Sequence, residues 1–199
     1  MPGASQVSII NGALDHIACK PIVGIADASP QAQAAVRAWS KALQASLREA
    51  TPGFATAIVA LTLHATYVPL HWLFAYTYPA NCLAMNKVYN EGTVDPTVGE
   101  EFREVYHPTT NEKIIVTNCD LAYGEYTFDL TDTTLFDASF VKTLEYRLAA
   151  DLAAPLVRNK ELEDSMDKKF IISASECARY NAYEQKNATK QKSSFVDAR

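Results

Sequence analysis

The stretch WLFAYTYPAN, residues 72–81, places an aromatic ring at every second position until it reaches a proline. Side chains alternate between the two faces of a β-strand, so positions i and i+2 share a face. One face of the predicted strand therefore carries the four rings of Trp72, Phe74, Tyr76 and Tyr78. The other face carries the smaller set Leu73, Ala75 and Thr77, and we expect that face to be exposed or covered by a partner.

An aromatic ladder of this kind is either one wall of a β-sandwich core or an exposed platform on which sugars or bases stack. No basic residue is interleaved with the rings, and Pro79 closes the strand. Burial of large rings is favourable by about 25 cal/mol per Å² of apolar surface. We therefore interpret the four rings as a core aromatic ladder.

Five further segments of strand length surround the ladder and are rich in β-branched and aromatic residues. They are TAIVALTLH (56–64), CLAMNKVYN (82–90), REVYH (103–107), EKIIVTN (112–118) and GEYTFDL (124–130). Six short strands separated by turn residues predict an antiparallel β-sandwich or partial barrel. We place this β-domain at residues 54–135.

Helical periodicity precedes the β-domain, over about residues 5–19 and again from Ser29. Serine caps a helix and proline fits its first position, so Ser29-Pro30 indicates a helix start. The second helix is expected to run for about 20 residues to the breaker at 51–53. Its buried face is expected to hold Val36, Trp39, Leu43 and Leu47, opposite a solvated face with Arg37, Lys41 and Arg48.

Helical periodicity returns after the β-domain. Asp137 and Asn159 are the expected N-caps of two helices, and Pro155 is expected to end or kink the first of them. Apolar residues at helical spacing are Phe140, Leu144, Leu148 and Leu152, then Leu162, Met166, Phe170, Ala174 and Cys177. The fold class is therefore α+β, with helices of 1–53 and 136–190 packing as a small bundle and 191–199 as a flexible tail.

Composition limits the function. The chain has 199 residues, 48% of them hydrophobic, which is enough for a buried core. Its net charge of −5 argues against a general nucleic-acid binder. The most apolar window, residues 54–63, is shorter than the roughly 20 residues that span a bilayer, and the first residues lack a signal-peptide pattern. We expect a soluble protein with free thiols at Cys19, Cys82, Cys119 and Cys177.

A search for catalytic or metal-binding patterns finds little support. The four histidines are scattered, and none lies in a zinc-binding spacing. The chain contains no phosphate-binding glycine loop and no nucleophile elbow. We therefore predict a protein without enzymatic activity, metal ion or cofactor.

The pattern as a whole resembles the tail tubular protein A family, the head-to-tail adaptors of short-tailed bacteriophages (podoviruses). The resemblance is carried by segments in a common order: 13–35, 54–63, 72–88, CDLAYGEYTFDLTDTTLFDASF (119–140) and LEYRLAADLAAPLVRNKEL (144–162). This chain has Pro52-Gly53 where the family usually has a tryptophan, and Asn81 where aspartate is common. Asparagine can make a similar turn contact.

The resemblance implies a structural protein of the virion neck, assembled in the bacterial cytoplasm. In the family, twelve copies form a ring below the portal protein, continue the DNA channel, and carry the tail nozzle and the tail fibres or spikes. Double-stranded DNA passes through such a ring without sequence-specific binding, and no membrane is involved. The alternatives are another neck protein, such as a stopper or head-completion factor, or a β-sandwich glycan-binding module.

Two sets of site residues follow from this implied role. Twelve copies would give a ring of about −60, whose acidic wall would repel DNA phosphates. Candidates for the channel lining are Glu100, Glu101 and Glu104. Candidates for docking to the portal are Arg179, Tyr183, Lys186, Lys190, Lys192 and Phe195, on the last helix and the tail.

Overall fold

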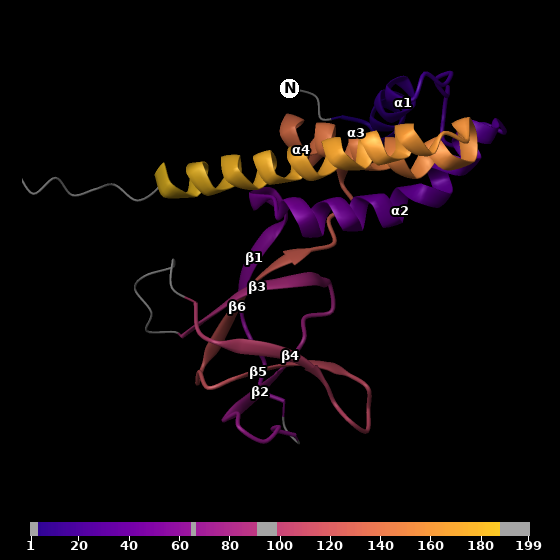
Figure 1. Ribbon diagram of the computed structural model, residues 1–199. Helices are drawn as coiled ribbons and strands as arrows, with labels where there is room; N and C mark the ends of the chain where they lie inside the picture. Colours follow the sequence, from indigo (N-terminus) through magenta and orange to yellow (C-terminus); the bar gives the residue numbers. More distant parts are fainter. Residues whose placement is uncertain (1–3, 65–66, 91–98, 188–199) are drawn as a thin grey trace, which may run out of the picture. The chain divides into compact units, whose positions relative to one another are not determined.

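The computed structural model describes residues 4–64, 67–90 and 99–187, and it has an α+β fold (Figure 1). The chain forms two compact units. The helical unit combines residues 1–53 with 132–199, and the β unit comprises residues 54–131. The β unit is thus an insertion between helices that come from the two ends of the chain. The expected tail at 191–199 lies outside the described residues.

The helical unit contains α1 (Gln6–His16), α2 (Pro30–Ala50), α3 (Ala138–Val157) and α4 (Lys160–Asn187). The predicted caps are confirmed, because side-chain oxygens of Ser29, Asp137 and Asn159 accept hydrogen bonds from backbone N–H groups three residues later. Helices α1, α2 and α4 each pack on α3. The bundle is therefore organised around one helix instead of two equivalent helix pairs.

The predicted apolar faces of α3 and α4 are confirmed. Fully buried side chains of α3 are Phe140, Leu144, Leu148 and Leu152, and those buried on α4 include Met166, Phe170, Ala174 and Cys177. Spacing of three or four residues places each set on one side of its helix, which explains how the two helices share a core. Figure 1 shows α3 and α4 running beside each other.

The expectation for Val36 of α2 is corrected, and of the two readings of Pro155 in α3, the ending of the helix is corrected. Val36 is 46% exposed, because the buried side of α2 is made largely of alanines, among them Ala32, Ala35 and Ala42, together with Leu43 and Leu47. Small residues let two helix backbones approach, and the larger valine lies outside that contact. Pro155 lies inside α3, which continues to Val157 and ends where Arg158 adopts a left-handed φ of 56°.

Helices α1 and α3 meet at a titratable pair. His16 Nε2 lies 3.8 Å from Glu145 Oε2, and a Cβ on Gly12 would lie 2.3 Å from Glu145 Oε1. Burial raises the pKa of Glu145 and lowers the pKa of His16, so both shifts favour the neutral forms. His16 and Glu145 therefore form a polar contact between two closely packed helices, and not a strong ion pair.

The β unit contains β1 (Thr56–Ala60), β2 (Phe74–Thr77), β3 (Cys82–Asn90), β4 (Phe102–Tyr106), β5 (Lys113–Thr117) and β6 (Ala122–Phe128). All six predicted strand segments are confirmed. They form two antiparallel three-stranded sheets with the orders β1-β6-β3 and β2-β5-β4. One-turn 3₁₀ helices, η1 (Gly53–Ala55) and η2 (Thr133–Leu135), flank the strands.

The two sheets share a core, as expected for a sandwich. Tyr76 and Ile115 of one sheet pack in the same cluster as Met85, Val88 and Tyr126 of the other. Gly124 of β6 lies in this core, where a Cβ would come within 2.8 Å of Leu61 Cδ2 and 3.1 Å of Met85 Sδ. A larger residue at that position would overpack the core.

Leu148→Ala should lower the free energy of unfolding by about 2–5 kcal/mol, because it leaves a cavity in the centre of the helical unit. Denaturant unfolding followed by circular dichroism measures this change. The matched control Val36→Ala, at the exposed position on α2, should change it by less than about 0.5 kcal/mol. Equal effects of the two substitutions would contradict the packing described.

Glu145→Gln should stabilise the protein at pH 7 and have little effect near pH 3. Since the folded-state pKa of Glu145 is raised, its ionised form is disfavoured in the fold at pH values above that pKa, and the penalty disappears below the unfolded-state pKa. Unfolding experiments at both pH values test this, with the exposed Glu176→Gln as control. A variant less stable than the parent at pH 7 would show that the pair is a net stabilising ion pair.

Candidate functional site

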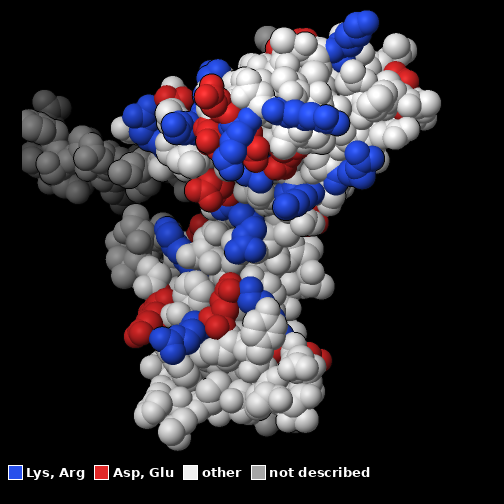
Figure 2. Space-filling view, turned by 45° about the vertical axis from the view of Figure 1, so that its right-hand side comes forward, with Lys and Arg blue, Asp and Glu red and all other residues white. Residues whose placement is uncertain are grey.

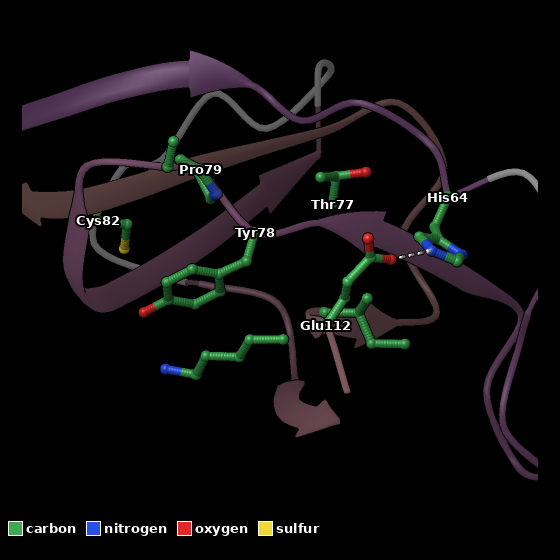
Figure 3. A pocket seen from close by; sticks show the side chains of 9 residues that line it. His64, Thr77, Tyr78, Pro79, Cys82 and Glu112 are labelled. Atoms are coloured by element: carbon green, nitrogen blue, oxygen red, sulfur yellow. Dashed lines mark ion pairs between the residues drawn. The ribbon is translucent and has the colours of Figure 1, made fainter. Parts of the chain in front are cut away.

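A hollow of about 510 Å³ lies in the β unit, where the end of β2 and the start of β5 meet the turn into β3 (Figure 3). Its lining combines ionisable, aromatic and small residues. The lining residues are His64, Thr77, Tyr78, Pro79, Ala80, Cys82, Glu112, Lys113 and Ile114.

Backbone hydrogen bonds bring three chain segments to this hollow. Thr77 pairs with Ile114 across β2 and β5. The N–H of Thr77 donates to Thr62 O at 2.8 Å, and the N–H of His64 donates to Ala75 O at 2.8 Å, so residues 62–64 extend the sheet beyond β2. Cys82 N donates to Pro79 O at 3.1 Å, which closes the turn into β3. The position of His64 is thus set by strand pairing.

His64 and Glu112 form one side of the hollow. The Nε2 atom of His64 is 3.7 Å from Glu112 Oε2, and Figure 3 shows the carboxylate directed toward the imidazole ring. The His64 ring also packs against His107 with a centroid distance of 5.5 Å. His107 Nδ1 accepts hydrogen bonds from the N–H groups of Thr109 and Thr110, which is compatible with the neutral tautomer protonated on Nε2.

The other side of the hollow is a group of mutually satisfied polar side chains. Lys113 Nζ lies 2.7 Å from Glu104 Oε2 and 4.0 Å from the Tyr78 ring centroid. The Tyr78 hydroxyl donates to Glu104 Oε1 at 3.1 Å. Burial raises the pKa of the Tyr78 phenol and of the Cys82 thiol. Both groups are therefore protonated at neutral pH.

The thiol and the phenol that line this hollow are held in their protonated forms. A protonated thiol and phenol are weak nucleophiles. The negative charge of Glu104 is matched by Lys113, and the carboxylate of Glu112 is largely exposed to solvent. Among the described residues, no three His, Cys, Asp or Glu side chains gather closely enough to hold a metal ion. None of the described helices is long and apolar enough to span a membrane.

The aromatic ladder is built only in part as predicted. Phe74, Tyr76 and Tyr78 belong to the core between the two sheets, and Tyr76 is 1% exposed. Trp72 packs instead beside Ala75, Ile114 and Val116, on the other side of the strand. The prediction of four rings on one face is therefore wrong for Trp72.

The backbone explains why the alternation fails there. His71 has a positive φ of 78°, so the chain enters β2 from a turn and not from an extended segment. The face expected to be exposed or covered by a partner is buried at Ala75 by the protein itself, while Leu73 is 68% exposed. Because the rings lie in core clusters, they do not form an open stacking platform.

The three acidic candidates for a channel lining differ in their surroundings. Glu104 lies on β4 and is paired with Lys113 and Tyr78, so its charge is partly neutralised. Glu100 and Glu101 precede β4 and are exposed. Their backbone groups are fixed, because Glu100 N donates to Val88 O and Glu101 O accepts from Thr117 Oγ1.

The candidates for portal docking lie partly outside the described residues. Arg179 and Tyr183 are exposed on α4, and the Arg179 guanidinium lies 5.8 Å from the centroid of the Tyr180 ring. Lys186 is in the last turn of α4, and its side chain is not described. Lys190, Lys192 and Phe195 lie outside the described residues.

The basic stripe of α2 is solvated, as predicted for Arg37, Lys41 and Arg48. Arg37 and Lys41 line a shallow hollow of about 290 Å³ in the helical unit, together with Asp151 of α3. Burial raises the pKa of Asp151, against the opposing effect of Arg147, whose guanidinium lies 2.9 Å away. All four cysteines are free thiols, and Cys119 and Cys177 are buried.

Sequence reasoning named Tyr183 but missed the other members of an exposed apolar set on α4. It consists of Ile171, Ile172, Tyr180 and Tyr183, each between 53% and 60% exposed. The helical phase set by Phe170 and Ala174 was a usable signal for Ile172, since a residue about half a turn away must face outward. The approach of His64 to Glu112, by contrast, had no local signal.

No protein-family model matches this chain, and no curated protein matches it significantly.

Tyr76→Phe should lower the free energy of unfolding by about 1–3 kcal/mol. The buried hydroxyl donates to Cys119 O at 2.9 Å and accepts from Ala122 N at 3.3 Å, so its removal leaves two buried backbone groups without this partner. Tyr106→Phe, at a residue 67% exposed, is the matched control and should be nearly neutral. Thermal or urea unfolding measures both, and a neutral effect at position 76 would contradict the hydrogen-bonded core described.

Proposed function

We propose that this chain is a structural head-to-tail adaptor of a short-tailed phage. In this role, copies of the chain form a ring below the portal, extend the DNA channel and hold the nozzle and the tail fibres or spikes. The proposal rests on the sequence resemblance and on the surface that the folded chain leaves uncovered.

Three of the five segments that carry the resemblance cross from one helix to the next or from the β unit to the helical unit. Residues 13–35 run from the end of α1 to the start of α2, and residues 119–140 run from β6 to the start of α3. Residues 144–162 contain most of α3 and the first turn of α4. A likeness at these places supports a shared chain path through both units.

The single observation that carries the proposal is the uncovered side of α4. One side of this helix is buried in the helical unit, while Ile172, Arg179 and Tyr183, at positions i, i+7 and i+11, lie together on the exposed side, with Ile171 and Tyr180 exposed on its two flanks. Isolated exposed apolar residues are common, but a set along one helix is typical of a protein–protein contact. Aromatic residues and arginine are also enriched where such contacts are strongest.

The β unit has an uncharged region of its own. Residues 50–86 contain no Asp, Glu, Lys or Arg, and Leu63, Leu70 and Leu73 within them are more than half exposed. Figure 2 shows a largely uncharged surface at the end of the β unit that carries β2. Uncovered apolar surface on both units suits a protein that holds several neighbours.

A channel-lining role is best supported for Glu100 and Glu101. Their carboxylates are exposed, whereas Glu104 is engaged with Lys113. Repeated around a ring, such charges would keep DNA phosphates from adhering to the wall.

Electron microscopy of the purified chain mixed with the portal protein of the same phage tests the proposal. We expect a ring with the symmetry of the portal's tail end to appear beneath it. Tyr183→Glu should weaken this association by on the order of tenfold or more, because it charges the uncovered side of α4. Tyr106→Glu, at a similarly exposed residue of β4, is the control. Portal rings that stay bare at micromolar concentrations of the parent chain would refute the proposal.

A further inference from the structure

Two three-stranded sheets have four edges, and three of these are blocked against further pairing. The β2 edge is covered by residues 62–64. The β3 edge is irregular at two places in its register, and Val88 O on that strand already accepts from Glu100 N. The β4 edge carries the exposed charges of Arg103 and Glu104. Irregular register and charged side chains are the usual means of keeping an edge strand unpaired.

The fourth edge, β1, has none of these features. Its sequence TAIVA lacks charge and proline, and its register with β6 is regular over all five residues. Ile58 is 61% exposed and Val59 is 36% exposed. An apolar, regular edge strand of this kind is a template for pairing with another strand.

The hydrogen-bond pattern shows which backbone groups are available. Leu61 N donates to Ala122 O at 2.8 Å, so odd-numbered residues of this strand point their N–H and C=O groups toward β6. The backbone groups of Ile58 and Ala60 therefore point to the open edge. They are spaced as an incoming strand requires.

We propose that β1 is a strand-addition site, which accepts an extended, uncharged segment rich in β-branched residues from another protein of the tail. Main-chain hydrogen bonds to Ile58 and Ala60 would supply the pairing, and the apolar side chain of Ile58 would favour an apolar neighbour over a charged one. This inference rests on the proposed function, which places the chain between a portal and a nozzle.

Symmetry argues against a second copy as the donor. Among the strand edges described above, the only one of matching chemistry that another copy offers is β1 itself. Pairing of β1 with β1 is isologous and closes after two copies, whereas a ring needs a contact that repeats around an axis. Pairing of two β1 edges is therefore unsuited to a ring, and we take a different protein of the tail as the donor.

Two substitutions test the site in the full-length chain. Ala60→Pro removes an N–H group that points away from β6, and Ile58→Lys adds a charge to the edge. Neither removes a β1–β6 hydrogen bond, so both variants should keep the parent's melting temperature within a few degrees. Leu135→Lys, at a leucine of η2 that is 55% exposed and lies outside the proposed contact surfaces, is the control for the added charge.

Binding is measured with purified portal and purified nozzle protein of the same phage, each offered separately. We expect Ala60→Pro and Ile58→Lys to lose at least tenfold in affinity for one of them, while Leu135→Lys does not. Hydrogen exchange should show the Ile58 and Ala60 amides unprotected in the free chain and protected in that complex. This readout tests the site even where a variant folds poorly.

Three outcomes would overturn the inference. Parent-like binding by both variants, with these amides still unprotected in the complexes, would refute the strand-addition site and leave the adaptor proposal intact. Protection that appears when the chain associates with itself, without portal or nozzle, would assign the edge to a second copy. A parent chain that binds neither protein would remove the adaptor proposal and this inference together.

Discussion

The burial of α3 is the constraint on which the structure depends. Four large side chains of this helix are fully buried, as are Ala149 and Ala153 on its other flanks. A helix with so much apolar surface is stable only when other elements cover it. Those elements are α1 and α2 from one end of the chain and α4 from the other. The chain ends must therefore come together, and the β unit can only be an insertion between them.

Because each unit has its own core, each also has surface that remains available for contact with other proteins. The helical unit uses one side of α4 for cohesion, so the residues half a turn away, such as Ile172, remain uncovered. The core of the β unit lies between its two sheets, where Tyr76 and Tyr126 pack, and among the described strands β1 is at the end of its sheet. In the hollow near His64, the Cys82 thiol is protonated and Lys113 is paired with Glu104.

Periodic signals in the sequence were sufficient to predict the helices and strands, but not to predict which residues each of them packs against. The leucines of α3, the Ser29-Pro30 start and the six strand segments were all predictable, because each depends on local spacing or capping. Trp72 was predicted on the wrong face because the chain turns at His71. Val36 was predicted to be buried, but it is exposed because alanines make the close contact of α2. The approach of His64 to Glu112 depends on how residues 62–64 pair with β2, which local sequence does not encode. The channel and docking assignments come from the family resemblance and remain predictions.

Native-state hydrogen exchange of the full chain over a denaturant series tests the central claim most directly. If α3 requires helices from both ends of the chain, the most protected amides of α2, α3 and α4 should exchange through one common opening with a single free energy. The account would be contradicted if α2 opened at a much lower free energy while α3 and α4 stayed protected, since the N-terminal helices would then be dispensable to the core.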